Sequence, residues 1–433
     1  MTNRTRNHLA VFFGTAGSFK NQVSSTMAAQ LMGLVLATAQ GVVLARWLGT
    51  EGKGVVALAM LVSSALAMLL NPGLTASYVF HAAGARLPLQ VLTRHAVTFS
   101  SLAGLAGIAL FGLGLATGVV QRLLPGVPTA PLLLAVAALP VTILSALLGA
   151  LLHGQQRIRT LNVVTVARAA VVLVLTVAAL IGLGLGPVGA VGAILAGTLV
   201  TVAAFGWLLQ QDGDAWKPGF ERTTATHLLH YGTRAHAGNL AQFFNYRLDM
   251  FVVNFIAGPA AVGIYTVAVR LAELVWQLPN AAAFAMFPRA ASRSREEMNR
   301  FTPRVFVVTL AGATVAAIGL AAVGRFAIRL LYSEDFLAAY LPLLLLLPGT
   351  VLLGGAKVLT NDLAGRGFPH YNAITATVAL VVTVGLDIVL VPAYGVAGAA
   401  VASTVAYTVT LALAGSMYRG ITRGNPETEP RST

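Results

Sequence analysis

Long apolar runs separated by short polar connections make up most of this sequence. A run of about 20 apolar residues is long enough to cross a bilayer as a helix. Twelve such runs can be distinguished, near residues 22–45, 54–80, 96–119, 129–152, 161–184, 187–210, 233–257, 261–288, 304–324, 337–357, 370–391 and 394–418. The pattern therefore predicts an all-α polytopic membrane protein with twelve transmembrane helices.

The least obvious division lies within the uncharged run from Ala169 to Gln211. As one helix this run would be about 64 Å long, twice a hydrocarbon core of about 30 Å. The chain must therefore turn back on itself. The glycine-rich segment GLGLGPVG at 182–189 is where it can do so.

Composition supports the membrane assignment. Hydrophobic residues make up 57% of the 433 residues and charged residues only 10%, and the mean hydropathy is +0.79. Soluble domains carry about 25% charged residues. The chain has no cysteine, which excludes disulfides, thiolate metal sites and thiol nucleophiles. No small-residue cleavage site follows the short apolar patch near the start, so we expect the N-terminus to be retained.

Lysine and arginine residues are distributed unevenly between alternate connections. Of the 28, 19 lie at the N-terminus, in the connections that follow even-numbered spans and at the C-terminus, whereas the opposite side holds Arg46, Lys53, Arg122, Arg325 and Arg329. The positive-inside rule then places both termini in the cytoplasm. The net charge of +14 mostly reflects this topology. A nucleic-acid partner is not expected, because no soluble domain is predicted to carry a basic face.

The stretch from 239 to 288 joins two apolar runs at Gly258 and Pro259, and it carries four charges. They are Arg247, Asp249, Arg270 and Glu273. An ionisable group inside a span is costly and is by default a candidate functional residue. Structural pairs are the alternative: Arg270 with Glu273 at i,i+3, or Asp249 with Arg270 on the next helix. Arg247 and Asp249 lie about 200° apart around a helix, so they cannot both face one partner.

Other charges within the spans are fewer. Arg168 and Lys357 lie in spans but near enough to the cytoplasmic side that snorkelling to the interface is an alternative. Asp387 lies about one turn from an external boundary. Asp249 has no basic neighbour at i,i+3 or i,i+4, which makes it a candidate for ion coupling. The charged residues within the spans sum to a net positive charge, which suits an anionic substrate.

The two halves of the sequence resemble each other. A shift of 209 residues places Gly49 on Gly258 and Gly54 on Gly263, and a shift of 206 places GAVGAILAG at 189–197 on GVAGAAVAS at 395–403. Such a duplication predicts two six-helix bundles related by a pseudo-two-fold axis along the membrane normal. The predicted boundaries are a bundle at 1–210, a cytoplasmic linker at 211–232, a bundle at 233–418 and a disordered cytoplasmic tail at 419–433.

Several of these motifs resemble one known family. They are ARWLGTEGKG at 45–54, YRLDMFVVNFIAGPAAVGIYTVAVRLAELVWQLP at 246–279 and FPRAA at 287–291. The sequence is similar to the polysaccharide and lipid-linked oligosaccharide flippases of the multidrug, oligosaccharidyl-lipid and polysaccharide exporter superfamily. The resemblance implies a MATE-like, V-shaped pair of bundles in the bacterial inner membrane, with a cationic cavity that opens alternately to each face.

The resemblance also implies a substrate, a polyprenyl-diphosphate-linked glycan, and as partners the membrane lipids and the glycan polymerase or glycosyltransferases of the same pathway. A diphosphate needs fixed cations in a wet cavity. Its candidate ligands are Arg247, Arg270, Arg168, Lys357 and Arg46. Candidates for ion coupling are Asp249 and Glu273. Candidate glycan contacts are Gln242, Asn245, Tyr265 and Gln277, with Asn280 and Asn361, although hydrogen bonds between helices are the alternative role for each.

Two other classes of function are alternatives. A cation-coupled exporter of drugs or metabolites shares the fold, but cavity carboxylates would be expected to outnumber cavity arginines. A membrane glycosyltransferase, polymerase or ligase would need a sizeable external loop rich in acids and histidines, and the external connections are short. His227, His230 and His236 are expected to form an interfacial face rather than a metal site. No phosphate-binding loop is present, so we expect no ATP use, no cofactor and no catalytic residues.

Overall fold

The structure is a computed structural model, and it describes residues 19–84, 86–209, 216–219 and 221–423. Every regular element in this part of the chain is a helix. The chain forms two compact units. The N-terminal unit comprises the described residues of 1–48, 59–121 and 128–236, and the C-terminal unit comprises 49–58, 122–127 and those of 237–433.

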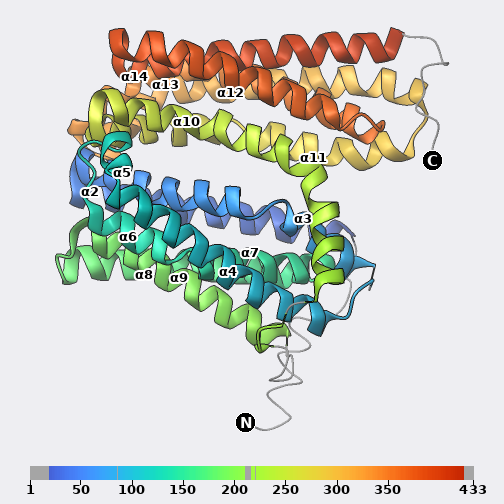
Figure 1. Ribbon diagram of the computed structural model, residues 1–433. Coiled ribbons are helices and arrows are strands. Elements are labelled where there is room, and N and C mark those ends of the chain that lie inside the picture. Colours follow the sequence, from blue (N-terminus) through green and yellow to red (C-terminus); the bar gives the residue numbers. More distant parts are fainter. Residues whose placement is uncertain (1–18, 85, 210–215, 220, 424–433) are drawn as a thin grey trace. The chain divides into compact units, whose positions relative to one another are not determined.

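Most helices of the N-terminal unit pack around α7 (Figure 1). The elements of this half of the chain are α2 (Phe19–Leu70), α3 (Leu74–Ala83), α4 (Leu89–Ala116), α5 (Val119–Leu123), α6 (Thr129–Ala137), α7 (Leu139–Gly154), α8 (Ile158–Val177), the π-helix η1 (Ala178–Gly182) and α9 (Gly186–Leu209). Helices α3, α4 and α9 contact α7, and α8 contacts α9. Leu74, Leu92, Leu147 and Leu151 are fully buried at the centre of this packing.

Helix α13 is the central element of the C-terminal unit. The elements of this half are α10 (Arg222–Leu274), α11 (Gln277–Ser292), α12 (Arg295–Leu331), the 3-10 helix η3 (Glu334–Ala339), α13 (Tyr340–Gly365) and α14 (His370–Arg423), and α13 contacts α11, α12 and α14. A buried ion pair closes one end of it: Arg366 Nε lies 2.8 Å from Asp362 Oδ2. Thr302 and Asn299 of α12 bind the two charged groups, so the pair also fixes α12 to α13.

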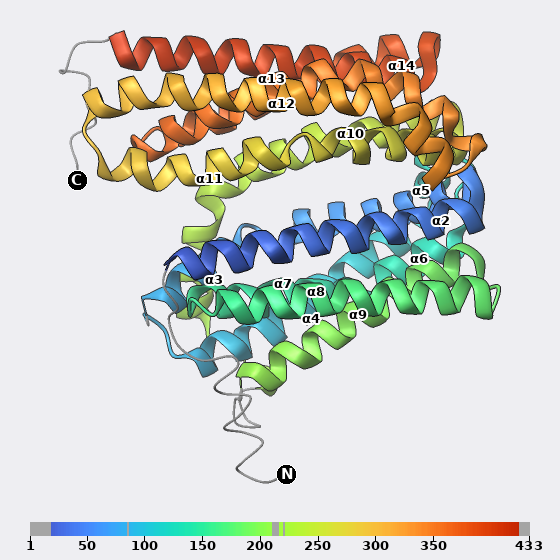
Figure 2. The same ribbon diagram turned by 180° about the vertical axis from the view of Figure 1, so that it is seen from behind.

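Eight helices in the described part of the chain are long and apolar enough to cross a membrane, or nine if the bent pair α6 and α7 is one span. Three of them, α2, α10 and α14, are too long for one crossing and contain a glycine with non-helical dihedral angles. These glycines are Gly49, Gly258 and Gly395, with φ of 67°, 79° and 55°. Figures 1 and 2 show the chain reversing direction within each of these helices. Only glycine adopts such φ values without steric cost.

The predicted connections contain Gly49 and Gly258 and lie next to Gly395, but several smaller breaks were not predicted. The turn predicted at 182–189 is where η1 ends and α9 begins, and the turn at Gly258 is present. The run predicted at 54–80, however, is interrupted between α2 and α3, where Gly73 has φ of 73°. The run at 129–152 bends by 41° between α6 and α7. Pro140 lies at this bend, and a proline removes a helical hydrogen bond.

The last part of the predicted linker and the first part of the predicted tail are helical. Helix α10 begins at Arg222, inside the range predicted as a linker, and residues 210–215 and 220 of that region lie outside the described residues. Helix α14 continues to Arg423, inside the predicted tail, and the remainder of that tail is also outside the described residues. His227, His230 and His236 lie on α10. No group of three or more histidine, aspartate or glutamate side chains suited to a metal ion is found among the residues described.

Two glycines allow helices of the C-terminal unit to cross with their backbones in contact. A Cβ atom on Gly54 would lie 1.8 Å from Pro259 O, and one on Gly263 would lie 1.9 Å from Thr50 O. Any side chain here would force the helices apart. The same shift of 209 residues that relates Gly54 to Gly263 also relates Thr50 to Pro259. The contact is therefore reciprocal, as expected if these two segments arose by duplication.

Candidate functional site

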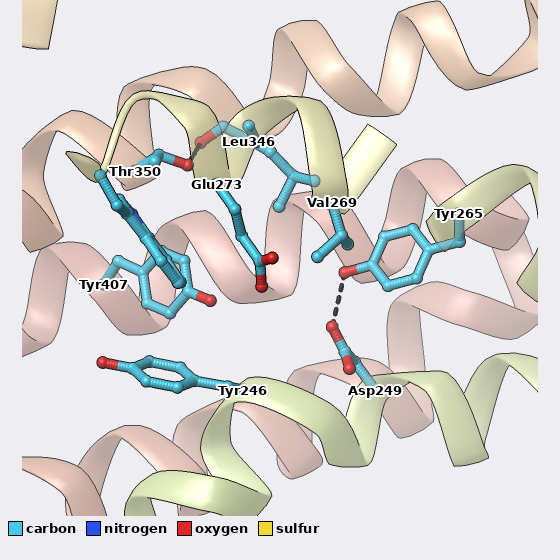
Figure 3. Close-up of a pocket in the computed structure, with 10 residues that line it drawn as sticks. Tyr246, Asp249, Tyr265, Val269, Glu273, Leu346, Thr350 and Tyr407 are labelled. Atoms are coloured by element: carbon cyan, nitrogen blue, oxygen red, sulfur yellow. Dashed lines mark hydrogen bonds between the residues drawn. The ribbon is translucent and has the colours of Figure 1, made fainter. Parts of the chain in front are cut away.

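A small polar pocket opens inside the C-terminal unit, between the two limbs of α10 and facing α13 and α14 (Figure 3). The first limb, before Gly258, provides Tyr246 and Asp249, and the second provides Tyr265 and Glu273. The pocket has room for about one water molecule or a bare ion, and so it is too small for a sugar. Aromatic rings of Trp276 and Tyr407 complete its polar lining.

Glu273 bridges two arginines. Its Oε1 lies 2.9 Å from Arg247 Nη2, and its Oε2 lies 3.5 Å from Arg270 Nη1. Arg247 is 27% exposed and Arg270 is 69% exposed, so both guanidinium groups remain within reach of a ligand. One carboxylate thus holds two cations that would otherwise be unbalanced at this depth of the helices.

The partner of Arg247 comes from the returning limb of the same helix. The second limb of α10 runs back alongside the first and brings Glu273 opposite Arg247. The pair predicted between Arg270 and Glu273 is present but long. Arg247 and Asp249 face different partners, as their angular separation predicted.

Asp249 is buried at 3% exposure and is bound by two donors. The hydroxyl of Tyr265 donates to Oδ2 at 2.6 Å, and the amide of Met250 donates to Oδ1 at 2.8 Å. Figure 3 shows this phenol of the second limb directed at Asp249 on the first. Tyr265 is itself fully buried, so it makes the contact between helices that was the alternative to a glycan contact.

A second buried carboxylate lies in electrostatic range of Asp249 and was noted from the sequence as a charge within a span but not as a site residue. Asp387 of α14 has no exposed surface, and neither of its carboxylate oxygens has a hydrogen-bond partner within the described structure. It lies within electrostatic range of Asp249. One turn before it, Thr383 donates to Asn245 Oδ1 at 3.1 Å. Two buried carboxylates within electrostatic range repel each other when both are charged, and a cation or proton between them would relieve that repulsion.

The remaining candidate cations belong to both units. Lys357 of α13 donates to Asn280 Oδ1 at 2.9 Å, and its ammonium lies 4.2 Å from the centroid of the Trp276 ring. In the N-terminal unit, Arg168 of α8 is exposed and reaches Thr198 Oγ1 of α9 at 3.4 Å, while Arg46 is exposed on α2.

The amide side chains take mixed roles. Gln277 and Asn280 are exposed, which leaves them accessible to a polar ligand. Asn245 is buried and bonded to Thr383, whereas Gln242 donates to the Tyr246 hydroxyl at 3.1 Å. Asn361 donates to the backbone carbonyl of Lys357. Asn245 therefore makes a contact between helices, Gln242 and Asn361 bond within their own helices, and only Gln277 and Asn280 of these five amides are exposed.

The fold is that of the transporters of the MOP superfamily. Lipid II flippase MurJ in an inward closed conformation is similar over 93% of this chain and 88% of its own, with a TM-score of 0.76 and 15% identity. An inward-facing multidrug resistance MATE family transporter of the MOP superfamily is similar over 94% of this chain and 99% of its own, with a TM-score of 0.74 and 16% identity. At these identities the likeness concerns the fold alone.

Sequence comparison gives the family. The polysaccharide biosynthesis protein family matches residues 19–294, more than half of the chain, and the protein belongs to this family. A protein of Haloferax volcanii, described as the probable low-salt glycan biosynthesis flippase Agl15, is 22% identical over 244 residues. That match covers 54% of this chain, and the chain spans half the length of this relative.

Proposed function

We propose that this multi-pass membrane protein is a flippase that moves a polyprenyl-diphosphate-linked oligosaccharide across the cell membrane by alternating access, for the biosynthesis of a surface polysaccharide. The observation that carries the proposal is the placement of Arg247 and Arg270 on one shared carboxylate, Glu273, in a member of the polysaccharide biosynthesis protein family. The similarity to a described glycan flippase and to the fold of a lipid II flippase supports it.

The shared carboxylate suggests how a diphosphate would bind. A diphosphate carries about two negative charges and cannot enter hydrocarbon unpaired. Its oxygens could satisfy both guanidinium groups at once, since arginine presents a planar fork suited to phosphate. Glu273 would then act as a resident counter-ion that the substrate displaces. Lys357, beside the exposed Asn280 and Gln277, would face the adjoining phosphate or sugar.

We further infer that the chain crosses the membrane twelve times, because the reversals at Gly49, Gly258 and Gly395 add three crossings to the nine apolar helices. Both termini would lie in the cytoplasm. The chain has no native cysteine, so a single cysteine reports its own position. We expect a cysteine at Glu296, which is exposed, to stay unlabelled by an impermeant maleimide in intact cells. A cysteine at Asp335, exposed at the opposite ends of the helices, should be labelled, and the reverse pattern would contradict the topology.

Asp249 is the residue we propose for ion coupling, with Asp387 as its companion. Among the described residues, neither buried acid forms an ion pair with Arg247 or Arg270, so an ion could be taken up without displacing the diphosphate ligands. Entry of a cation or proton between them would relieve their mutual repulsion. This gives the carrier a means to couple an ion gradient to its change of state.

The direct test of the proposed function uses the full chain in liposomes that contain a short polyprenyl-diphosphate-linked sugar. We expect the sugar to become accessible in the opposite leaflet within minutes with the protein and not within hours without it. An exporter of organic cations is the second candidate, because Asp249, Glu273 and the Trp276 ring lie close together and would bind a cation if a change of state widened the space between them. Efflux of an organic cation with no movement of the lipid-linked sugar would favour that candidate and overturn the flippase.

A further inference from the structure

A buried lysine lies where the sequence predicted an external loop. Lys53 is only 7% exposed, on the second limb of α2, in a segment that belongs to the C-terminal unit. The predicted placement in a loop is wrong because α2 is interrupted only at Gly49 and continues as a helix through Lys53. Its ammonium lies 5.7 Å from the centroid of the Tyr332 ring at the end of α12. Within the described residues no carboxylate pairs with it.

Burial of the Lys53 ammonium lowers the stability of the protein when no anion is bound. A buried charge normally requires an opposite charge and hydrogen bonds to offset its lost hydration. A single contact with an aromatic ring offsets only part of that loss. The nearest acid in sequence, Glu51, is exposed rather than directed into the same buried space. Lys53 is therefore a buried cation that has no counter-ion among the described residues and could bind an anion.

The surroundings of Lys53 are also electropositive. The crossing of Gly54 and Gly263 places the first turns of two helical limbs side by side, one beginning after Gly49 and the other after Gly258. The N-terminal turn of a helix carries partial positive charge and unpaired amide donors. Arg270 lies within electrostatic range of both Lys53 and Tyr332. The buried Lys53 ammonium thus lies in the first turn of one limb, beside the first turn of the other, with Arg270 in electrostatic range.

We propose that Lys53, Arg270 and the hydroxyl of Tyr332 form a second anion site, which takes a phosphate or diphosphate group. This inference rests on the proposed function. In that function, the diphosphate binds here after it leaves Arg247. Arg270 is the residue the two sites share. Its long side chain is 69% exposed and only loosely bound to Glu273, at 3.5 Å, so it can follow the anion from Arg247 toward Lys53.

The site can be tested by binding alone, with the full chain in nanodiscs of neutral lipid and inorganic pyrophosphate as the probe. Because Arg247 is expected to bind pyrophosphate as well, the Arg247→Ala variant serves as the background. In that background we expect pyrophosphate still to raise the melting temperature. Adding Lys53→Met should weaken the apparent affinity at least about tenfold, the effect of losing one charge-assisted contact. Lys53→Arg, which keeps the charge, should stay within about threefold.

Arg329 is the matched control. It lies near the end of α12 next to Tyr332, is exposed and already pairs with Glu334. Arg329→Met should leave pyrophosphate affinity unchanged. Without pyrophosphate, Lys53→Met should keep or raise the melting temperature, because it removes a buried charge that has no counter-ion. A purely structural contact between Lys53 and Tyr332 predicts the opposite: a lower melting temperature and an unchanged affinity. That result would overturn the site.

Two further comparisons complete the test. One identifies the source of the anion, and the other distinguishes failure of this site from failure of the proposed function. If nanodiscs with anionic phosphatidylglycerol abolish the Lys53-dependent binding of pyrophosphate, a lipid headgroup occupies the site and the hand-over of substrate is overturned. If the wild-type chain fails to move the lipid-linked sugar but keeps Lys53-dependent binding, the anion site stands and the flippase proposal fails. Flipping at the wild-type rate by Lys53→Met would show that the substrate does not pass through this site.

Discussion

Arg247→Ala is expected to abolish translocation of the lipid-linked glycan. Truncating one partner of a close, charge-assisted contact costs about 2–5 kcal/mol, so the initial rate should fall at least about 30-fold. The protein should still reach the membrane, because Glu273 keeps Arg270 as a partner and both side chains of the lost pair are partly exposed. The stability lost with such a pair is about 1 kcal/mol. The measurement is the initial flipping rate in liposomes at equal amounts of protein.

The neighbouring carboxylate provides the control for this experiment. Glu273→Gln removes the resident counter-ion without removing a cation, so we expect it to bind the diphosphate more tightly than the wild type. The double variant Arg247→Ala with Glu273→Gln should remain inactive. The difference between its effect on the flipping rate and the sum of the two single effects measures the interaction of the two residues. Normal flipping by Arg247→Ala at normal abundance would contradict the assignment and would leave Arg270 as the principal ligand.

Asp387→Asn is expected to remove the dependence of flipping on an ion gradient. With one of the two buried acids neutral, Asp249 can hold its charge without a companion ion, because the repulsion between the carboxylates is gone. The stimulation produced by an imposed sodium or proton gradient should be lost. Asp249→Asn should have the same effect, since it neutralises the other member of the pair. The measurement compares initial rates with and without each gradient in sealed liposomes.

A matched acid outside the pocket controls for a general effect of removing one negative charge. Asp335 is exposed and lies in η3, so Asp335→Asn should leave the gradient response intact. Full gradient stimulation in Asp387→Asn, at normal abundance and basal rate, would show that the buried acids do not take part in coupling. Binding of the diphosphate should be unaffected in all three variants, because Arg247 pairs with Glu273 and not with either aspartate.

The main reversals of the chain could be predicted from glycine, proline and apolar run length, whereas smaller breaks could not. Gly258 beside Pro259, and the glycines at 182–189, lie between runs too long for one helix. The bend at Ala138 and the break between α10 and α11 lie inside runs of suitable length, and nothing in the hydropathy pattern marks them. Pro140 is a local signal for the first of them, but the position of the second depends on packing against neighbouring helices, which a single sequence does not contain.

Part of the site could be predicted because intramembrane charges are rare, but their partners could not. Arg247, Asp249, Arg270 and Glu273 were identified by the cost of placing them in a span. The pairing of Arg247 with Glu273 depends on how the two limbs of α10 face each other, and the burial of Lys53 depends on a contact with residues more than 200 positions away. Asp387 was discounted because its depth was judged from the end of an apolar run rather than from the neighbouring helices.

The crossing of Gly54 and Gly263 also bears on how the protein is made. Residues 49–58 leave the ribosome more than 200 positions before Pro259 and Gly263, against which they pack. Until the second half is inserted, this stretch of α2 lacks its native neighbour, and contacts between such distant segments form late in folding. We therefore expect the C-terminal unit, which includes residues 49–58, to complete its packing only after the second half of the chain has been inserted.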